Sequence, residues 1–114
     1  MEQTQQEFLQ EIVSSVKPYS LVLLIKGPNV SETGRTMDEI QFGHLKHLMN
    51  LRKDGILPIH GPTDGDENIV GIGIYNSTDV EQVKKCCEDD PGFKAGRFTY
   101  KILPFFTFPG SQLS

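Results

Sequence analysis

Cysteine is scarce in this chain, and its two cysteines, Cys86 and Cys87, are adjacent. Two consecutive residues of a predicted helix cannot form an ordinary disulfide, so no cysteine pair is left to staple a secreted fold. A reducing compartment therefore suits the protein. Both side chains are expected to be small inward-facing groups, because no basic cluster stands near them and the acidic residues 88–90 disfavour a thiolate.

An excess of basic residues and a long apolar run are missing as well. The chain has 11 Lys and Arg against 15 Asp and Glu, a net charge of −4, which argues against a protein that binds nucleic acid by neutralising phosphates. No apolar run reaches the ~18 residues that a membrane-spanning helix needs. The N-terminal residues are polar and acidic, unlike a signal peptide. We therefore expect a cytoplasmic protein with neither nucleic acid nor membrane as a partner.

The length of 114 residues suits one domain. Thr4 and Glu7 form a capping box, and apolar residues follow at helical spacing, which predicts an N-terminal helix. From Tyr19 to Lys26 the chain is almost continuously apolar, as is typical of a strand covered on both faces. We therefore expect a helical extension at 1–17 and the main domain at 18–114.

The segment from Thr36 to Pro62 carries the most distinctive pattern. Thr36 and Glu39 form a capping box at the start of a predicted helix, and Gly55 suits its end. With about 100° between consecutive residues, the apolar side chains of this helix fall within one arc, and His44 lies inside that arc. A buried imidazole without a partner costs about 1–3 kcal/mol. His44 is therefore expected to meet a partner from another part of the fold.

Three further strands and one further helix are predicted after this segment's helix. The strands are expected at about 56–60, 68–76 and 97–106, and Thr78 with Glu81 forms a capping box that opens the second helix. The order is then β-α-β-β-α-β, a split unit of the ferredoxin-like kind. We therefore expect an α+β fold in which both helices cover one face of a four-stranded antiparallel sheet.

The other face of this sheet is expected to be apolar too. The first strand is apolar on both sides, and the last one leads into Phe105, Phe106 and Phe108. In the strand at 68–76 the glycines share one face, where they leave room for something to pack closely. An uncovered apolar face would exceed the roughly 300–600 Å² patch found on monomers. We therefore expect a homodimer packed sheet against sheet, and a higher oligomer stays open.

Three familiar binding motifs find no support in the sequence. The GIGIYN segment has Asn76 where a dinucleotide-binding loop needs its third glycine. Its isoleucines stand where an RNA-recognition sheet needs stacking aromatic residues. The acidic turn at 64–67 lacks the number and spacing of ligands of a calcium-binding loop.

Two motifs together resemble one family. The first is H-L-x-x-L-x-x-L-x-x-x-G-x-L-x-x-x-G-P, from His44 to Pro62, and the second is D-P-x-x-x-x-G, from Asp90 to Gly96, followed by a strand that ends in Pro104-Phe105. Over about residues 19–106 the chain resembles the YCII-related (YciI-like) proteins.

This resemblance implies a dimeric α+β barrel with a His–Asp pair at the active site, which carries over onto His44 and Asp90. Some relatives act as dehydrochlorinases on chlorinated hydroxyquinols. Several relatives have an arginine shortly before the motif histidine, where this chain has Gln41-Phe42-Gly43. Any anion-binding role therefore falls to Arg35 or is absent.

A His–Asp pair can perform acid–base chemistry. A carboxylate that accepts from one imidazole nitrogen orients the ring and leaves the other nitrogen free to transfer a proton. We therefore expect an enzyme of the lyase or hydrolase type, acting without a cofactor on a small organic substrate, aromatic or halogenated. The catalytic residues are then His44 and Asp90. The expected substrate-binding residues are His60, Arg35, Phe42 and Phe93.

Three alternatives stay open. In the first, His44 and Asp90 form a purely structural pair in a non-catalytic module that binds a small ligand or a partner. In the second, the three histidines, His44, His47 and His60, hold a metal together with Asp90. In the third, the same barrel architecture serves an oxygenase or haem-linked enzyme, which would show cofactor absorbance.

Overall fold

The main domain is built on a split β-α-β-β-α-β unit, and the computed structural model describes residues 2–28 and 37–114. Along the chain, these residues form α1 (Gln5–Ser15), β1 (Lys17–Lys26), α2 (Met37–Lys53), β2 (Ile59–Pro62), β3 (Ile69–Tyr75), α3 (Val80–Glu88), α4 (Pro91–Lys94) and β4 (Phe98–Thr107). The predicted α+β fold is confirmed, with the short helix α4 added before the last strand.

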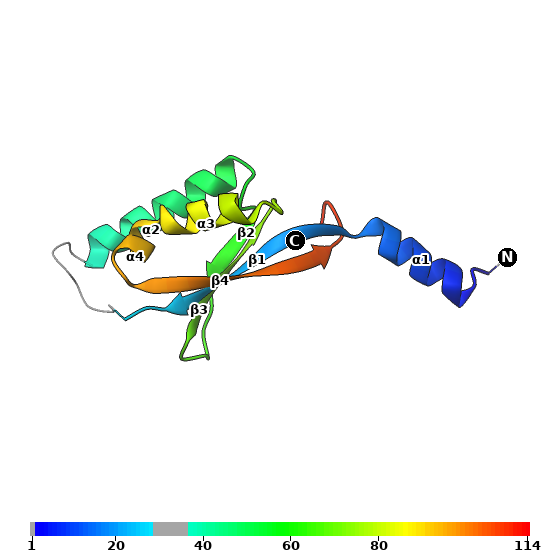
Figure 1. The fold of residues 1–114 in the computed structure, drawn as a ribbon, viewed down its shortest axis with the longest axis horizontal. Helices are drawn as coiled ribbons and strands as arrows, with labels where there is room; N and C mark the ends of the chain where they lie inside the picture. The colour runs from blue at the N-terminus through cyan, green and yellow to red at the C-terminus, as the bar shows by residue number, and fades with distance from the viewer. Residues whose placement is uncertain (1, 29–36) are drawn as a thin grey trace.

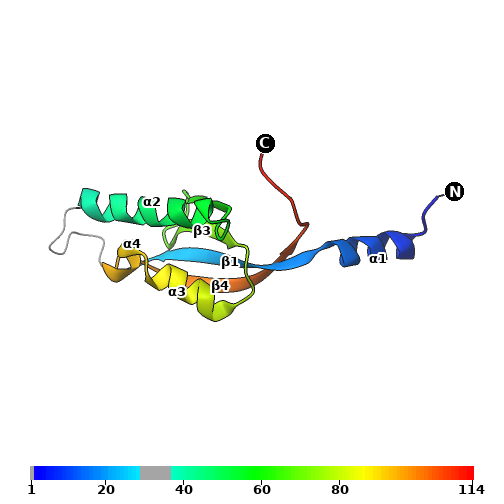
Figure 2. The ribbon, with the colours of Figure 1, turned by 90° about the horizontal axis from the view of Figure 1, so that it is seen from above.

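The four strands form one antiparallel sheet in the order β2-β3-β1-β4. The apolar strand β1 lies in the middle, where Val22 pairs with Gly73 of β3 and with Ile102 of β4. Helices α2, α3 and α4 all lie on one side of the sheet (Figure 1), and seen from above α2 and α3 run side by side over it (Figure 2). The helix arrangement is therefore the one that the sequence predicts.

The hydrophobic core lies between these helices and the sheet. Val83 of α3, Val22 of β1 and Leu57 are almost fully buried. Cys87 also lies in this core, and its burial raises the pKa of its thiol to about 12. Cys86 is half-buried, and desolvation raises the pKa of its thiol as well. Both cysteines are therefore neutral thiols rather than reactive thiolates.

No helix of the described residues lies on the opposite face of the sheet (Figure 1). Because side chains alternate along a strand, the neighbours of the core residue Val22 point to this second face. The same alternation places Val70, Ile72 and Ile74 of β3 there. The second face thus includes Leu21, Leu23, Ile25, Val70, Ile72 and Ile74, of which Val70 is exposed.

Two local predictions need correction. Strand β2 begins at Ile59 rather than Ile56, because the N–H groups of Ile56 and Leu57 donate to the carbonyl of Leu51 and close the end of α2. The cap of α3 is Asp79 rather than Thr78. Its carboxylate accepts from the N–H groups of Glu81 and Gln82, so the chain enters the helix one residue later than predicted.

The start of α2 is only partly described. Gly55 takes a left-handed conformation with a φ of 76° just after the helix, as predicted. The predicted capping residue Thr36 lies outside the described residues, so the capping box with Glu39 stays a prediction. In the described parts of the chain, no helix combines the length and the apolar character needed to cross a membrane.

Helix α1 projects away from the main domain beyond the end of β1 (Figures 1 and 2). Thr4 caps it by accepting from the N–H of Glu7, as predicted. None of its residues is buried, and Phe8, Leu9 and Val13 are all more than half exposed. The division of the chain into an extension at 1–17 and a domain at 18–114 stays a prediction.

Candidate active site

Helices α2 and α4 bring His44 and Asp90 into contact. The Nδ1 atom of His44 lies 2.7 Å from Oδ2 of Asp90. The two helices can approach because Gly43 precedes the histidine, where even a Cβ atom would lie 3.1 Å from the ring of Pro91. The side chain of His44 is 16% exposed and that of Asp90 is 3% exposed. Because the aspartate is buried, water screens its attraction to the imidazole of His44 only weakly.

Asp90 is held through both of its carboxylate oxygens. It is the N-terminal cap of α4, and its Oδ1 accepts from the N–H of Gly92 at 2.8 Å. A Cβ atom at Gly92 would lie 2.5 Å from Cε2 of Phe98, so only glycine fits there without a shift. The carboxylate is thus fixed on one side by the backbone and offers its other oxygen to His44.

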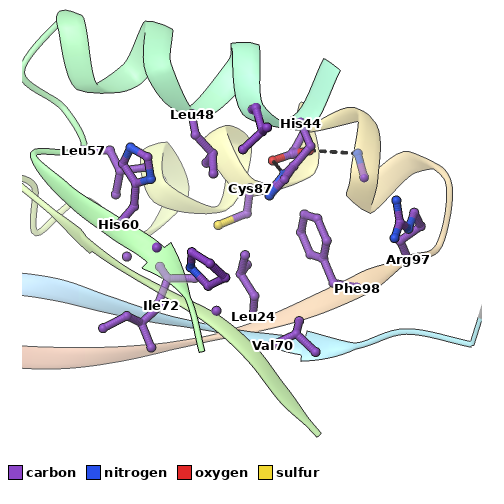
Figure 3. A pocket seen from close by; sticks show the side chains of 18 of the residues that line it. Leu24, His44, Leu48, Leu57, His60, Val70, Ile72, Cys87, Arg97 and Phe98 are labelled. Atoms are coloured by element: carbon purple, nitrogen blue, oxygen red, sulfur yellow. Dashed lines mark hydrogen bonds and ion pairs between the residues drawn. The ribbon is translucent and has the colours of Figure 1, made fainter. Parts of the chain in front are cut away.

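This arrangement sets the protonation of the imidazole ring. An ionised carboxylate only accepts hydrogen bonds, so the Nδ1 atom of His44 must carry the proton and donate it to Asp90. The ring also packs against Phe98, with 5.3 Å between ring centroids and 60° between planes. Within the described residues, Nε2 of His44 has no hydrogen-bond partner, and the ring points from α2 toward the cavity in Figure 3.

A cavity of about 610 Å³ lies between α2 and the sheet. This volume is within the ~300–1,000 Å³ that is usual for small-molecule sites. Gly71 and Gly73 are part of its wall, and a Cβ atom on Gly73 would lie 2.9 Å from Cδ1 of Leu57. The apolar side chains in its wall include Val22, Leu24, Ile40, Leu45, Leu48 and Phe98. The His44–Asp90 pair therefore borders a mostly apolar space large enough for a small molecule.

His60 lines the same cavity from strand β2 (Figure 3). Its Nε2 atom is buried and has no hydrogen-bond partner in the part of the chain that the structure describes. Burial lowers the pKa of His60 below its ordinary value, and the positive charge of Arg52 and the nearby His44 lower it further. His60 is therefore a neutral imidazole in the wall of the cavity at neutral pH.

The other predicted substrate-binding residues are placed differently. Phe42 is 69% exposed and Phe93 packs against Phe98 and Tyr100, and neither of them lines the cavity. Phe42 follows Gln41 on α2 and so points about 100° away from it, toward solvent. Arg35 lies outside the described residues.

His47 has a structural contact rather than a place in the cavity. Its Nε2 atom lies 2.7 Å from the backbone carbonyl oxygen of Cys86, which can only accept, so this nitrogen donates. Across residues 2–28 and 37–114, no three His, Cys, Asp or Glu side chains form a group that could hold a metal ion.

Two basic residues that the sequence did not single out also line the cavity, namely Arg97 and Lys26. Arg97 stands directly before Phe98, the first residue of β4. Because Arg97 precedes the strand, the alternation of strand side chains does not fix its direction. Its position next to Gly96, which ends the second motif, was the available signal.

Comparisons with solved structures give a structural likeness, and comparisons with family models and curated sequences give none. A solved structure of 5-chloro-2-hydroxyhydroquinone dehydrochlorinase (TftG) from Burkholderia phenoliruptrix AC1100, in complex with 2,5-dihydroxybenzoquinone, is similar with 23% sequence identity and a TM-score of 0.47. The likeness covers 73% of this chain and 90% of that one. The chemistry of the site is therefore inferred from the residues of this chain.

Proposed function

We propose that this protein is a small acid–base enzyme in which Nε2 of His44 exchanges a proton with a substrate held in the cavity. The observation that carries this proposal is the arrangement of the imidazole ring. Its Nδ1 is committed to the buried carboxylate of Asp90, while its Nε2 is left without a partner among the described residues. A neutral imidazole held in this tautomer is a general base with its lone pair directed at the cavity.

The role of Asp90 is to hold the ring and to stabilise it after it has taken a proton. Because its Oδ1 is tied to the N–H of Gly92, the carboxylate cannot turn away from His44. The imidazolium that forms during the reaction then faces a fixed negative charge. Removal of one such positioned acid–base group costs about 10²–10⁴ in rate.

Elimination is the reaction that this site suits best. In a saturated substrate His44 takes a proton from carbon, the electrons of that C–H bond form a double bond, and a halide departs with its bonding pair. In the keto tautomer of a chlorinated hydroquinone His44 takes the proton of a ring hydroxyl, the electrons of that O–H bond form a C=O bond, the ring double bond shifts, and chloride departs with its bonding pair. No thiolate nucleophile is offered by the cavity, because burial raises the pKa of Cys87 to about 12. Isomerisation uses the same base, with the proton returned to another atom of the substrate.

The family assignment belongs to this proposal. The motif residues of the YCII-like pattern gather at one place, since His44, Gly61, Pro62 and Asp90 all line the cavity. We therefore assign the chain to the YCII-related proteins and its substrate to small aromatic or halogenated compounds of the kind that dehydrochlorinases use. A cytoplasmic location goes with this assignment, supported by two cysteines that are both free.

A homodimer packed through the second sheet face also belongs to this proposal. None of the described helices covers the apolar side chains of that face, which include Leu23 and Ile72 (Figure 1). Burying such a face against a second copy stabilises the dimer by about 25 cal/mol for each Å² of apolar surface removed from water. Replacing Leu23 by Glu is expected to shift sedimentation from dimer to monomer, and an unchanged sedimentation coefficient contradicts the dimer.

The proposal is tested by a turnover screen with chlorinated hydroquinones, in which released chloride is measured. Wild-type protein is expected to release chloride, and His44→Gln is expected to lower kcat/KM by about 10²–10⁴. His47→Gln is the matched control, because glutamine can still donate to the carbonyl of Cys86. Equal activity of wild type and His44→Gln contradicts the proposal.

One observation favours a second candidate, a non-catalytic module that binds a small molecule. Asp90 already has a structural role as the cap of α4, and a histidine can serve simply to satisfy its second oxygen. In that case compounds that fill the cavity bind and raise the Tm without being changed. Ligands that bind tightly across the screen with no product from any of them support this second candidate.

A further inference from the structure

We infer that the cavity takes an organic anion, whose negative group is bound by Arg97 while its apolar body lies between α2 and the sheet. This inference rests on the proposed function and adds the charge of the substrate to it. Arg97 stands beside Phe98, the residue whose ring packs against His44. In Figure 3 Arg97 and His44 lie toward the same end of the cavity, and His60 lies toward the other.

The backbone of Arg97 is held on both sides. Its N–H donates to the carbonyl of Gly92 at 3.0 Å, and its carbonyl accepts from the N–H of Gly27 at 2.9 Å. The chain segments meet closely here, because a Cβ atom on Gly27 would lie only 2.3 Å from the carbonyl oxygen of Gly96. The backbone of Arg97 is therefore fixed in place. Gly92 positions both charged residues, because its carbonyl accepts from Arg97 and its N–H donates to Asp90.

Arg97 is half-buried, and the described residues give its guanidinium neither an ion pair nor a hydrogen bond. A partly buried charge without a partner is costly, and a bound anion would supply the partner. Arginine suits this role, since its planar fork donates two parallel hydrogen bonds to a carboxylate or a similar oxyanion.

The other charged residues in the cavity wall do not take this role. Asp90 directs both of its oxygens to His44 and Gly92. Lys26 and Glu67 are exposed, opposite in charge and open to screening by salt. Of the two described cations that line the cavity, Arg97 is thus the one better shielded from water, and it stands at the end that holds the acid–base pair.

The binding of an anion at this end would also serve the chemistry. A carboxylate withdraws electrons from the neighbouring carbon only weakly once ionised, but hydrogen bonds from a guanidinium spread its charge and make proton removal from that carbon easier. The apolar body of the substrate would then extend along Leu24, Leu48 and Leu57. The predicted substrate class is therefore a small carboxylate or comparable oxyanion with a flat apolar body.

The test compares two probes that differ in charge, a naphthalene carboxylate and the corresponding naphthalene carboxamide. Their affinities for the full-length protein are measured by NMR titration. We expect wild type to bind the carboxylate about tenfold more tightly than the carboxamide, the effect of one charge-assisted hydrogen-bond pair. Arg97→Gln is expected to remove this preference and to leave the affinity for the carboxamide unchanged.

Two further variants make the result decisive. Lys94→Gln removes a positive charge from an exposed residue of α4 that does not line the cavity, so it is expected to keep the preference. Arg97→Lys keeps the charge without the fork and is expected to keep part of it. The inference is overturned if wild type shows no preference, including no binding of the carboxylate, or if Arg97→Gln keeps the full preference.

The failure of this inference is distinguishable from failure of the proposed function. The affinity ratio is read without turnover, so a charge preference that disappears in Arg97→Gln stands even when no compound is converted. Conversely, turnover of neutral compounds that depends on His44, together with equal affinity for both probes, overturns the anion site alone.

Discussion

Replacing Asp90 by Asn is predicted to reverse the tautomer of His44. The Oδ1 atom of Asp90 accepts from the N–H of Gly92, and asparagine must keep its oxygen there because its amide nitrogen cannot accept. The amide NH₂ then faces Nδ1 of His44, where Asp90 now accepts at 2.7 Å. Nδ1 must become the acceptor, and the proton moves to Nε2. The nitrogen in the cavity is then a donor instead of a base.

The size of the effect differs between activity and stability. Loss of a correctly placed base lowers the rate by about 10²–10⁴. The variant keeps two hydrogen bonds but changes each from charge-assisted to neutral, a loss of roughly 1 kcal/mol apiece and about 2 kcal/mol in total. Asp90→Ala leaves both partners unsatisfied and removes the cap of α4, so its stability is expected to fall by about 2–5 kcal/mol. The Asn variant therefore separates the chemical role from the structural one.

The assay is long-range proton–nitrogen NMR of the histidine rings, recorded where the rings are neutral. Protonated and unprotonated ring nitrogens resonate far apart, so the tautomer is read directly. His47 is the internal reference, because its Nε2 donates to the carbonyl of Cys86. Wild-type protein is expected to show His44 and His47 in opposite tautomers, and Asp90→Asn is expected to make them the same. A wild-type His44 with its proton on Nε2, or an unchanged tautomer in Asp90→Asn, refutes the reasoning.

Two further predictions concern stability. Gly92→Ala is expected to lower the free energy of unfolding in chemical denaturation by about 1–3 kcal/mol, because its Cβ atom would lie 2.5 Å from Phe98. Gly61→Ala is the control and is expected to leave the free energy of unfolding unchanged, because no atom lies within 4 Å of its Cβ. Equal losses in both variants contradict the close packing at Gly92. His60→Leu is expected to gain about 1 kcal/mol at neutral pH by removing a buried polar atom that has no partner in the described structure. The pKa of His60 is lowered in the folded state, so as the pH falls below 6.5 the unfolded chain takes up the proton first and wild type loses stability. The stability advantage of His60→Leu over wild type is therefore expected to grow on acidification. A stability difference that shrinks on acidification contradicts this prediction.

Much of the fold could be predicted because the sequence pattern is local. The capping box at Thr4, the glycine at the end of α2 and the apolar run of β1 each act over a few residues, and the structure follows them. The cap at Asp79 was missed because Thr78 and Asp79 are both good capping residues. Nothing in the sequence tells which of the two side chains reaches the free N–H groups.

The part of the candidate site that could be predicted from the sequence is the contact between His44 and Asp90, one from each of the two motifs. The position of His44 in an apolar arc required a polar partner, and Asp90 now supplies it. Whether Arg97, Phe42 and Phe93 line the cavity depends instead on the directions of their side chains, which sequence spacing does not give. Their aromatic character predicts Phe42 and Phe93 in the wall of the cavity, but packing turns the first to solvent and the second toward Tyr100.

The central claim is that the imidazole of His44 transfers the proton, and chemical rescue tests it most directly. His44→Ala removes the ring and leaves a gap open to the cavity, into which free imidazole can enter. With a substrate found in the screen, we predict that His44→Ala loses about 10²-fold or more in kcat and regains activity in proportion to the concentration of neutral imidazole. Full activity of His44→Ala without imidazole would contradict the account, since a purely structural histidine can be lost without loss of the chemistry.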